Sequence, residues 1–316
     1  MDKKLIGIDL GGTSVKIAIL SLDGQIEQLW SIPTNIADEG AYIVSEIISS
    51  IQETLLENKL TANDILGIGM GSPGQIDYQK GTVTGAYNLG WATEQEIQSR
   101  FEKTFGVPFF IDNDANVAAL GERWKGAGEN ARDVIFVTLG TGVGGGIIAN
   151  GHLLHGKAGS AGEIGHMPIL GNPFSCTCGN VGCLETVASA TGIVNIALNR
   201  YDLVETATSL ADKIEAQKLS AKDIFDAAKE NDRFAYEVVA IFANYLGLSL
   251  AQLGNALNPD YIVIGGGVSA AGRFLLDKVT AEFEKYAFPT VRTSTHLKLA
   301  SLGNEAGVIG AASLVL

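Results

Sequence analysis

Two stretches of the chain repeat one pattern, and this repeat constrains the fold more than any other feature. Residues 6–20 read IGIDLGGTSVKIAIL and residues 135–149 read IFVTLGTGVGGGIIA. Each begins with an apolar run typical of a buried strand, turns at glycines and returns as a second strand. The repeat predicts a duplicated α/β unit, one copy in each of two domains, with a ligand between the two glycine turns. A length of 316 residues also fits two domains.

The rest of the chain alternates between strand and helix patterns. A helix is expected where apolar residues return on one face, as Ile43, Ile47, Ile51 and Leu55 do. The expected strands cover residues 5–10, 15–20, 65–70, 107–112, 133–140, 145–149 and 261–267; the expected helical stretches cover 41–58, 115–124, 189–258 and the chain after 304. Residues 151–186 are rich in glycine and read as irregular. This alternation indicates mixed α/β layers.

Composition and charge exclude several classes of protein. Hydrophobic residues make up 46% and charged residues 18%, which excludes disorder and supplies a packed core. There are 22 Lys and Arg against 35 Asp and Glu, a net charge of −13. Because a spread negative field repels polyanions, we expect neither nucleic acid nor an anionic membrane as a partner.

The sequence gives no sign of export or membrane insertion. The N-terminal MDKKLIGID reaches Asp9 too early for the apolar region of a signal peptide. Residues 238–259 carry no charge, but they include Asn244, Ser249 and Asn255, which lipid would leave unsatisfied. We therefore expect a buried core helix there and a soluble, cytoplasmic protein.

The first glycine turn is a candidate phosphate site. Asp9 stands at the end of a buried strand and could hold Mg²⁺ or its water. The backbone amides of Gly11 and Gly12 and the Thr13 hydroxyl could face a phosphate, and Lys16 could add a positive charge. The alternative is an ordinary hairpin turn with Asp9 as a turn-capping carboxylate.

The second glycine turn matches a dinucleotide fingerprint, but its context does not. Residues 140–145 fit G-x-G-x-x-G, yet the following GIIANG reads as a strand where that fold needs a helix. Residues 151–157 fit G-x-x-x-x-G-K, but Ala158 stands where a P-loop needs Ser or Thr. Both matches are therefore disfavoured as fingerprints.

A third glycine run follows a buried strand at Gly265 and Gly266. With Thr141 and Gly142 in the second turn, it predicts a nucleotide held across two domains, with phosphates at the first two loops and the base near the third. Phosphoryl transfer needs such a site, because its catalysis is mostly positioning and charge neutralisation.

The DNDAN segment offers a general base. Asp112 or Asn113 could simply cap the helix that follows. Asp114 is then surplus to capping and could accept the proton of a hydroxyl that attacks a γ-phosphate. Asn88, in the NLGW segment, is a weaker candidate for hydrogen bonding a polyol.

Glu163, His166 and Glu185 form a candidate sugar pocket among glycines. Carboxylates that accept hydrogen bonds from neighbouring hydroxyls suit sugar recognition. The alternative is that both acids are solvated loop residues.

His166 also belongs to a candidate metal site with Cys176, Cys178 and Cys183, spaced H-x9-C-x-C-x4-C. Three thiolates and one imidazole fill a tetrahedral Zn²⁺ site and leave no open position, so the site would be structural. Bound zinc would fix His166 and Glu185 and thus the sugar pocket. The alternative is three unconnected cytosolic thiols.

Taken together, these motifs resemble the ROK family (repressors, open reading frames and sugar kinases), most closely its bacterial glucokinases. The resemblance runs from about residue 5 to residue 312 and rests on DLGGT at Asp9, NDAN at Asn113, LGTGVGGG at Leu139, GEIGH at Gly162, CTCGNVGCLE at Cys176 and IVIGGG at Ile262. One mild departure is Ser72 in GSPG, where alanine is more usual.

The resemblance implies an α/β actin-like ATPase (ribonuclease H-like) fold, with two lobes hinged around a nucleotide and sugar cleft. We expect residues 1–113 with about 301–316 to form a small lobe and 114–300 a large lobe with the zinc loop. The resemblance implies ATP, Mg²⁺, structural Zn²⁺ and a homodimer. It makes Asp114 the general base on the sugar 6-hydroxyl, and assigns sugar contacts to Asn113, Glu163, His166 and Glu185, zinc to His166 and the cysteines, and nucleotide contacts to Gly11, Thr13, Thr141 and Gly266.

The implied activity is ATP-dependent phosphorylation of glucose at its 6-hydroxyl, a glycolytic reaction. One alternative keeps the chemistry and changes the sugar to N-acetylmannosamine, N-acetylglucosamine or fructose. The other is a sugar-sensing repressor of the same family, which the absence of a helix-turn-helix segment and of a basic patch disfavours.

Overall fold

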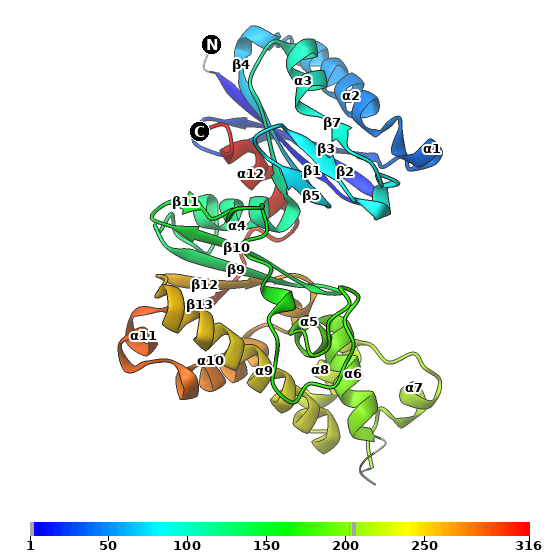
Figure 1. Ribbon diagram of the computed structural model, residues 1–316, viewed down its shortest axis with the longest axis vertical. Coiled ribbons are helices and arrows are strands. Elements are labelled where there is room, and N and C mark those ends of the chain that lie inside the picture. Colours follow the sequence, from blue (N-terminus) through cyan, green and yellow to red (C-terminus); the bar gives the residue numbers. More distant parts are fainter. Residues whose placement is uncertain (1–2, 202, 204–206) are drawn as a thin grey trace. The chain divides into compact units, whose positions relative to one another are not determined.

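The computed structural model describes residues 3–201, 203 and 207–316 (Figure 1). By internal contacts the chain forms two compact units. The first unit comprises Met1–Asn130, Leu153–Ala161 and Leu302–Leu316, and the second unit comprises Ala131–His152 and Gly162–Ser301. The short stretch Leu153–Ala161 thus belongs to the first unit, although the chain on either side of it belongs to the second.

The first unit is built on a five-stranded sheet in the order β3-β2-β1-β4-β8. β1 and β2 form the predicted antiparallel hairpin, and β4 pairs parallel with both β1 and β8. The strands are β1 (Lys4–Leu10), β2 (Ser14–Ser21), β3 (Ile26–Pro33), β4 (Ile65–Ser72) and β8 (Phe109–Asn113). A three-stranded sheet adds β5 (Gln75–Asp77), β6 (Thr82–Thr84) and β7 (Gln95–Glu96).

The second sheet repeats this topology in the order β11-β10-β9-β12-β13. β9 pairs antiparallel with β10 and parallel with β12, which in turn pairs parallel with β13. The strands are β9 (Val134–Leu139), β10 (Val143–Ala149), β11 (His152–Leu153), β12 (Tyr261–Gly265) and β13 (His296–Leu299). The two similar sequence segments therefore do occupy equivalent positions. The expected strand 261–267 ends earlier, at Gly265, because a 3₁₀ turn begins at Gly267.

The helices of the first unit are α1 (Ala37–Gly40), α2 (Ile43–Glu57), α3 (Gln98–Phe105), α4 (Asp114–Lys125) and α12 (Ala306–Ser313). α4 crosses α12 where Gly310 lies against the backbone: a Cβ on Gly310 would come 1.6 Å from the Val117 carbonyl oxygen. Glu122 of α4 is fully buried and accepts a hydrogen bond from the amide of Leu302 at 2.8 Å.

This packing bears on the expected lobes. The sequence predicts a small lobe of residues 1–113 with about 301–316 and a large lobe of residues 114–300. By contacts, the C-terminal helix does pack with the first unit, but α4 packs there too, so residues 114–130 group with the first unit, as does Leu153–Ala161.

The helices of the second unit are α5 (Glu185–Ala188), α6 (Ala190–Tyr201), α7 (Ala211–Glu215), α8 (Ala221–Lys229), α9 (Arg233–Leu257), α10 (Arg273–Tyr286) and α11 (Pro289–Ser294). In the part of the chain that the structure describes, α9 alone is long and apolar enough to cross a membrane by length and composition. It buries Phe234, Val238, Phe242 and Leu246 completely, as the predicted core helix would.

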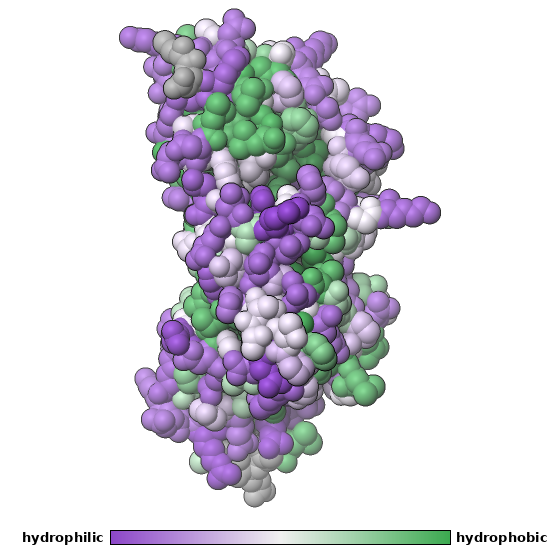
Figure 2. Space-filling view, turned by 90° about the vertical axis from the view of Figure 1, so that its left-hand side faces the viewer, coloured by the Kyte–Doolittle hydropathy of each residue, from purple (hydrophilic) through white to green (hydrophobic). Residues whose placement is uncertain are grey.

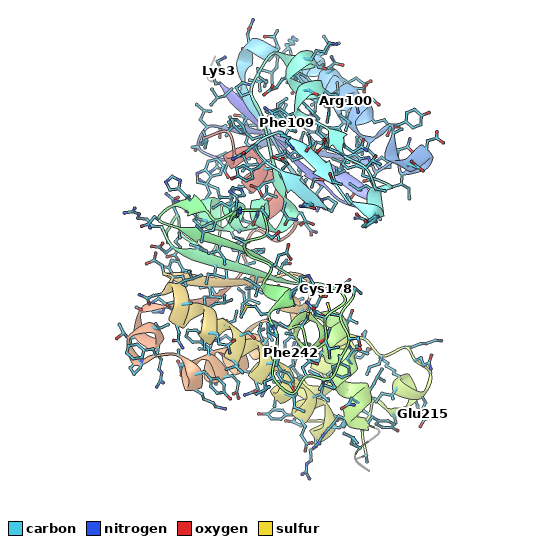
Figure 3. The ribbon with its side chains drawn as sticks, viewed as in Figure 1. Lys3, Arg100, Phe109, Cys178, Glu215 and Phe242 are labelled. Carbon is cyan, nitrogen blue, oxygen red and sulfur yellow. The ribbon has the colours of Figure 1, made fainter. Side chains whose placement is uncertain are left out.

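Each unit has its own hydrophobic core. The core of the second unit draws on residues between Ile135 and Val291, whereas two clusters in the first unit draw on residues up to Ile111 and on α12. Phe109 stacks on Phe101 with ring centroids 4.5 Å apart, and Phe242 packs edge-on to Phe225 in the other core (Figure 3). Hydrophilic side chains cover most of the face in Figure 2, and hydrophobic groups gather in patches between them.

Candidate active site and metal cluster

In the first glycine turn, Asp9 and Lys16 are direct partners in the β1–β2 hairpin. The half-buried Asp9 carboxylate lies against α12, where a Cβ on Gly307 would come 2.6 Å from its Oδ2. Burial raises the pKa of Asp9, and the positive charge of Lys16 opposes this rise. A carboxylate desolvated in this way favours a nearby cation, which suits the predicted metal role.

The turn between β1 and β2 is held by two hydrogen bonds at Gly11, and Thr13 is exposed. The Gly11 amide donates to the Ser14 carbonyl oxygen at 3.0 Å, and the Thr34 hydroxyl donates to the Gly11 carbonyl oxygen at 2.7 Å. Asn88 lies beside the same turn, because a Cβ on Gly12 would come 3.1 Å from its Nδ2. The first unit thus brings a predicted sugar contact next to the predicted phosphate loop.

The turn from β8 into α4 settles which residue caps the helix. Asn113 is the N-cap: its side chain accepts a hydrogen bond from the Ala115 amide at 2.9 Å. Asp114 is the first helical residue, is exposed, and also accepts from the Ala115 amide, at 2.8 Å. A carboxylate at this end of α4 is stabilised by the helix dipole.

Asp112 does not cap the helix. It is buried, only 3% exposed, and it accepts hydrogen bonds from residues around the turn. Its Oδ1 accepts from the Asn113 amide at 2.8 Å and from the Asn116 side chain at 2.7 Å. Its Oδ2 lies 2.5 Å from Nε2 of His155. Sequence reasoning gave no role to Asn116, although it ends the NDAN motif, and it missed His155, which belongs to no motif with a known spacing.

Ser72, the departure from the family pattern, lies across from Asn113 in the β4–β8 ladder. Its side chain is fully buried, and its hydroxyl donates to the Pro73 carbonyl oxygen at 3.0 Å. The extra hydroxyl is thus satisfied locally.

In the second unit, the second glycine turn is the β9–β10 hairpin, so no helix follows the fingerprint and the dinucleotide interpretation fails. Thr141 is exposed at its tip. Glu185, at the start of α5, leans over the turn: a Cβ on Gly142 would come 2.5 Å from its Oε2.

The third glycine run packs on the end of β9. Gly265 ends β12, and Gly266 has φ of 80°, with a Cβ position only 2.5 Å from the Leu139 amide nitrogen. Only glycine fits there, because a side chain would be both strained and blocked. The second and third glycine turns therefore lie together within the second unit.

Beside the third glycine run lies a cavity of about 370 Å³ within the second unit. Its walls come from α8 and from the turn that follows Gly266, and they include Phe225, Val268, Ala271 and Lys222. Sequence reasoning did not find these residues, because α8 reads only as an amphipathic helix. A cavity of this size and lining suits a flat, largely apolar group.

The four predicted zinc ligands converge. The ligand atoms of His166, Cys176, Cys178 and Cys183 all lie within 4.8 Å of one another. Nδ1 of His166 is 3.6 Å from Sγ of Cys176, and Sγ of Cys178 is 3.6 Å from Sγ of Cys183. Zn–S bonds of about 2.3 Å in a tetrahedron place two sulfurs about 3.8 Å apart, so the donor set and its spacing fit Zn²⁺. Figure 3 marks Cys178 in the loops beside α5.

The three thiols differ in their electrostatics. Burial raises the pKa of Cys176 to about 12, and its hydrogen bond to Glu185 adds to this rise. The Asn180 amide, with smaller help from Cys176, lowers the pKa of the exposed Cys178 to about 7. Without a cation, therefore, Cys178 ionises first and the buried thiols hold their protons.

The metal cluster also brings together the three predicted sugar contacts of the second unit. Nδ1 of His166, the nitrogen beside Cys176, is 4.0 Å from Oε1 of Glu185, and Nε2 is 3.8 Å from Oε2 of Glu163. If Nδ1 binds the metal, Nε2 keeps its proton and stays available as a donor. The structure thus couples the metal cluster to this half of the predicted sugar site.

The repeated sheets with glycine turns at their central hairpins define an α/β protein of the actin-like ATPase fold. The chain belongs to the ROK family, whose sequence model matches residues 5–316. A glucokinase from Halalkalibacterium halodurans is 47% identical over 99% of this chain and 95% of its own length.

Two further relatives bear on the site. The structure of a ROK family glucokinase from Streptomyces griseus, in complex with glucose and AMPPNP, is 32% identical, has a TM-score of 0.76 and matches over 98% of both chains. A xylose repressor from Caldicellulosiruptor bescii is 31% identical over 99% of this chain and 78% of its own length.

Proposed function

We propose that this protein is a glucokinase that transfers the γ-phosphoryl group of ATP to the 6-hydroxyl of glucose. One observation carries the proposal: a chain 47% identical to a glucokinase over its length keeps an exposed carboxylate, Asp114, at the first turn of α4 beside the capping Asn113. No proton acceptor is needed at that position for capping, which Asn113 already performs.

In this mechanism Asp114 acts as the general base. Its carboxylate takes the proton of the 6-hydroxyl as that oxygen forms its bond to the γ-phosphorus, and the bond from phosphorus to the bridging oxygen of ADP breaks. Asn88, Asn113, Glu163, His166 and Glu185 hydrogen bond the other hydroxyls and orient the sugar. In this orientation the 6-hydroxyl oxygen is aligned for its attack on the γ-phosphorus.

The glycine turns hold the nucleotide. The amides at Gly12 and Gly142, with the hydroxyls of Thr13 and Thr141, face its phosphates, and Lys16 adds charge. Gly11 holds the first turn in shape beside them, because its amide donates to the Ser14 carbonyl oxygen. The third turn at Gly265 and Gly266 supports the base, which enters the cavity lined by Phe225 and Val268. Magnesium, when bound, neutralises phosphate charge, and Asp9 is the residue that would hold it or its water.

Zinc has a structural role in this proposal. His166, Cys176, Cys178 and Cys183 would hold it in a closed sphere, so it does not take part in the transfer. It fixes the loop that presents His166 and Glu185. We further propose that the protein is a cytoplasmic homodimer and that its reaction belongs to glycolysis. Its partners are ATP and a sugar, and they include neither nucleic acid nor a membrane.

The test is ADP release from magnesium-ATP with glucose, mannose, fructose, N-acetylglucosamine and N-acetylmannosamine. We expect glucose to lead in kcat/KM by at least about tenfold, which is within what pocket contacts can discriminate. A leading N-acetyl sugar would keep the chemistry and reject glucose as the substrate. No turnover with any sugar would favour the repressor alternative, for which the relative in Caldicellulosiruptor bescii is the precedent.

The role of Asp114 is tested by Asp114→Asn. We expect kcat to fall by about 10³-fold while glucose still binds, because loss of a general base removes the proton acceptor but not the hydrogen bonds to the sugar. Asp277→Asn is the matched control, since Asp277 is exposed and pairs with Arg273 one helical turn away. Unchanged turnover in Asp114→Asn would refute the assignment.

A further inference from the structure

His155 makes an unusual contact for a residue in a glycine-rich connection. Its Nε2 lies 2.5 Å from Oδ2 of Asp112, and the side chains of His155 and Asp112 are only 23% and 4% exposed. His155 belongs to Leu153–Ala161, the short stretch that joins the first unit between two parts of the second. The imidazole is therefore held against the strand that leads into the predicted base.

A second contact fixes the plane of this imidazole. The ring of Tyr78 stacks on it, with centroids 4.0 Å apart and an angle of 18° between the planes. Tyr78 follows directly after β5, and the His155 carbonyl oxygen accepts a hydrogen bond from the Ala161 amide at 3.1 Å. The ring plane and the backbone of His155 thus each have a partner, and Nε2 is directed at Asp112.

Asp112 passes this constraint to the turn that carries Asp114. Its Oδ1 accepts hydrogen bonds from the backbone amide of Asn113 and from the side chain of Asn116. One carboxylate therefore binds the turn on both sides of Asp114. Its Oδ2 has His155 as its partner. A buried carboxylate oxygen without a hydrogen-bond partner is costly. Without His155, therefore, the carboxylate would rotate and weaken its hydrogen bonds to Asn113 and Asn116.

We propose that His155 is a positioning residue that fixes Asp114 and Asn113 through Asp112. The inference rests on the proposed role of Asp114 as general base. It assigns no contact with sugar or nucleotide to His155, only the hydrogen bond to Asp112.

The test compares steady-state kinetics of His155→Ala and His155→Gln in the full-length protein. We expect His155→Ala to lower kcat by about 10- to 100-fold, since a small displacement of a reacting group reduces the rate by this much. The KM for ATP should stay within about twofold of the wild-type value. Gln places an amide donor where Nε2 stood, so His155→Gln should recover most of kcat. His152→Ala is the control, because His152 is exposed and lies three residues away.

Two results would overturn the proposal. The first is a kcat for His155→Ala within twofold of the wild type. The second is equal loss in His155→Ala and His155→Gln, since hydrogen bonding would then not be the cause. Failure of the proposed function would show differently, as a wild-type protein that turns over no sugar. Side-chain ¹⁵N resonances of histidine give a readout independent of turnover: the His155 signal should shift in Asp112→Asn and stay in Asp277→Asn.

Discussion

At the scale of the residue, Cys178 gives the cleanest test of the metal cluster, because it is exposed while Cys176 and Cys183 are buried. In Cys178→Ser we expect zinc content to fall from about one atom per chain, since a hydroxyl is a poor zinc ligand. The KM for glucose should rise by about 10- to 100-fold, the usual cost of losing the support of a liganding group. Metal analysis and sugar kinetics check both.

The matched control for this variant is Thr177→Ala, because Thr177 is an exposed neighbour in the same loop that is not a ligand. It should keep both zinc and sugar affinity. A metal-free Cys178→Ser protein with a normal KM for glucose would refute the coupling between the zinc cluster and the sugar site.

The sequence revealed some residues of the candidate site and not others. The convergence of His166 with the three cysteines follows from ligand types at short spacing, which sequence displays directly. The choice of Asn113 over Asp112 as the cap was left open, because both residue types cap helices and only the backbone dihedrals decide. His155 could not be found, since its partner Asp112 lies 43 residues earlier in the chain.

At the scale of the element, the cap of α9 makes a prediction about pH. Asp232 accepts hydrogen bonds from the Ala235 amide at 2.9 Å and from the Ser209 amide at 2.7 Å. Burial alone would raise the pKa of Asp232, but these hydrogen bonds outweigh it and hold the pKa below its ordinary value of 3.8. The carboxylate thus stabilises the fold above pH 3.8, and this contribution is lost as the pH falls through the lowered value.

We therefore expect Asp232→Ala to lower the free energy of unfolding by about 1–2 kcal/mol at pH 7, the usual cost of losing a cap. The difference from wild type should shrink as the pH drops below 3.8. Urea denaturation across this range measures it. Asp277→Ala, which removes an exposed carboxylate, should show almost no effect. A difference for Asp232→Ala that stays constant with pH would contradict the role of the charged cap.

At the crossing of α4 and α12, we expect a glycine-to-alanine substitution to lower stability, although helix propensity alone predicts that it raises stability. Glycine to alanine inside a helix normally stabilises it by up to about 1 kcal/mol. Gly310→Ala should instead destabilise by about 3 kcal/mol, because its Cβ would come 1.6 Å from the Val117 carbonyl oxygen and push the helices apart. Gly267→Ala is the control: a Cβ there meets nothing within 4 Å, and its stability should be near wild type. Urea denaturation again gives the comparison.

Most elements with a strong sequence pattern were predictable, and most of those missed have a weak one. β1, β4 and β9 are runs of buried apolar residues, which a sequence shows plainly. β3 was missed because it is the sheet edge and alternates between exposed and half-buried residues. α10 was missed although Leu275, Val279 and Phe283, which it buries, recur every fourth residue, a signal that could have found it.

At the scale of the whole molecule, two cores without shared side chains predict that the units respond separately to loss of zinc. The metal cluster lies in the second unit, whereas Trp30, Trp91 and Trp124 all lie in the first. A ligand that binds only the folded state at about 1,000 times its Kd stabilises by about 4 kcal/mol. Chelation should therefore destabilise the second unit by an amount of this order and leave the tryptophan environment intact.

The measurement follows urea unfolding by tryptophan fluorescence and by hydrogen exchange at the amides of α9, with and without a zinc chelator. We expect the α9 amides to lose protection at lower urea after chelation, while the fluorescence midpoint stays in place. Cys178→Ser should show the shifted α9 transition without chelator and no further shift with it, which separates zinc loss from any other effect of the chelator. A fluorescence midpoint that moves together with α9 would mean that the two units unfold as one cooperative body, because only shared stabilisation can carry the loss of zinc into a core that contains none of its ligands.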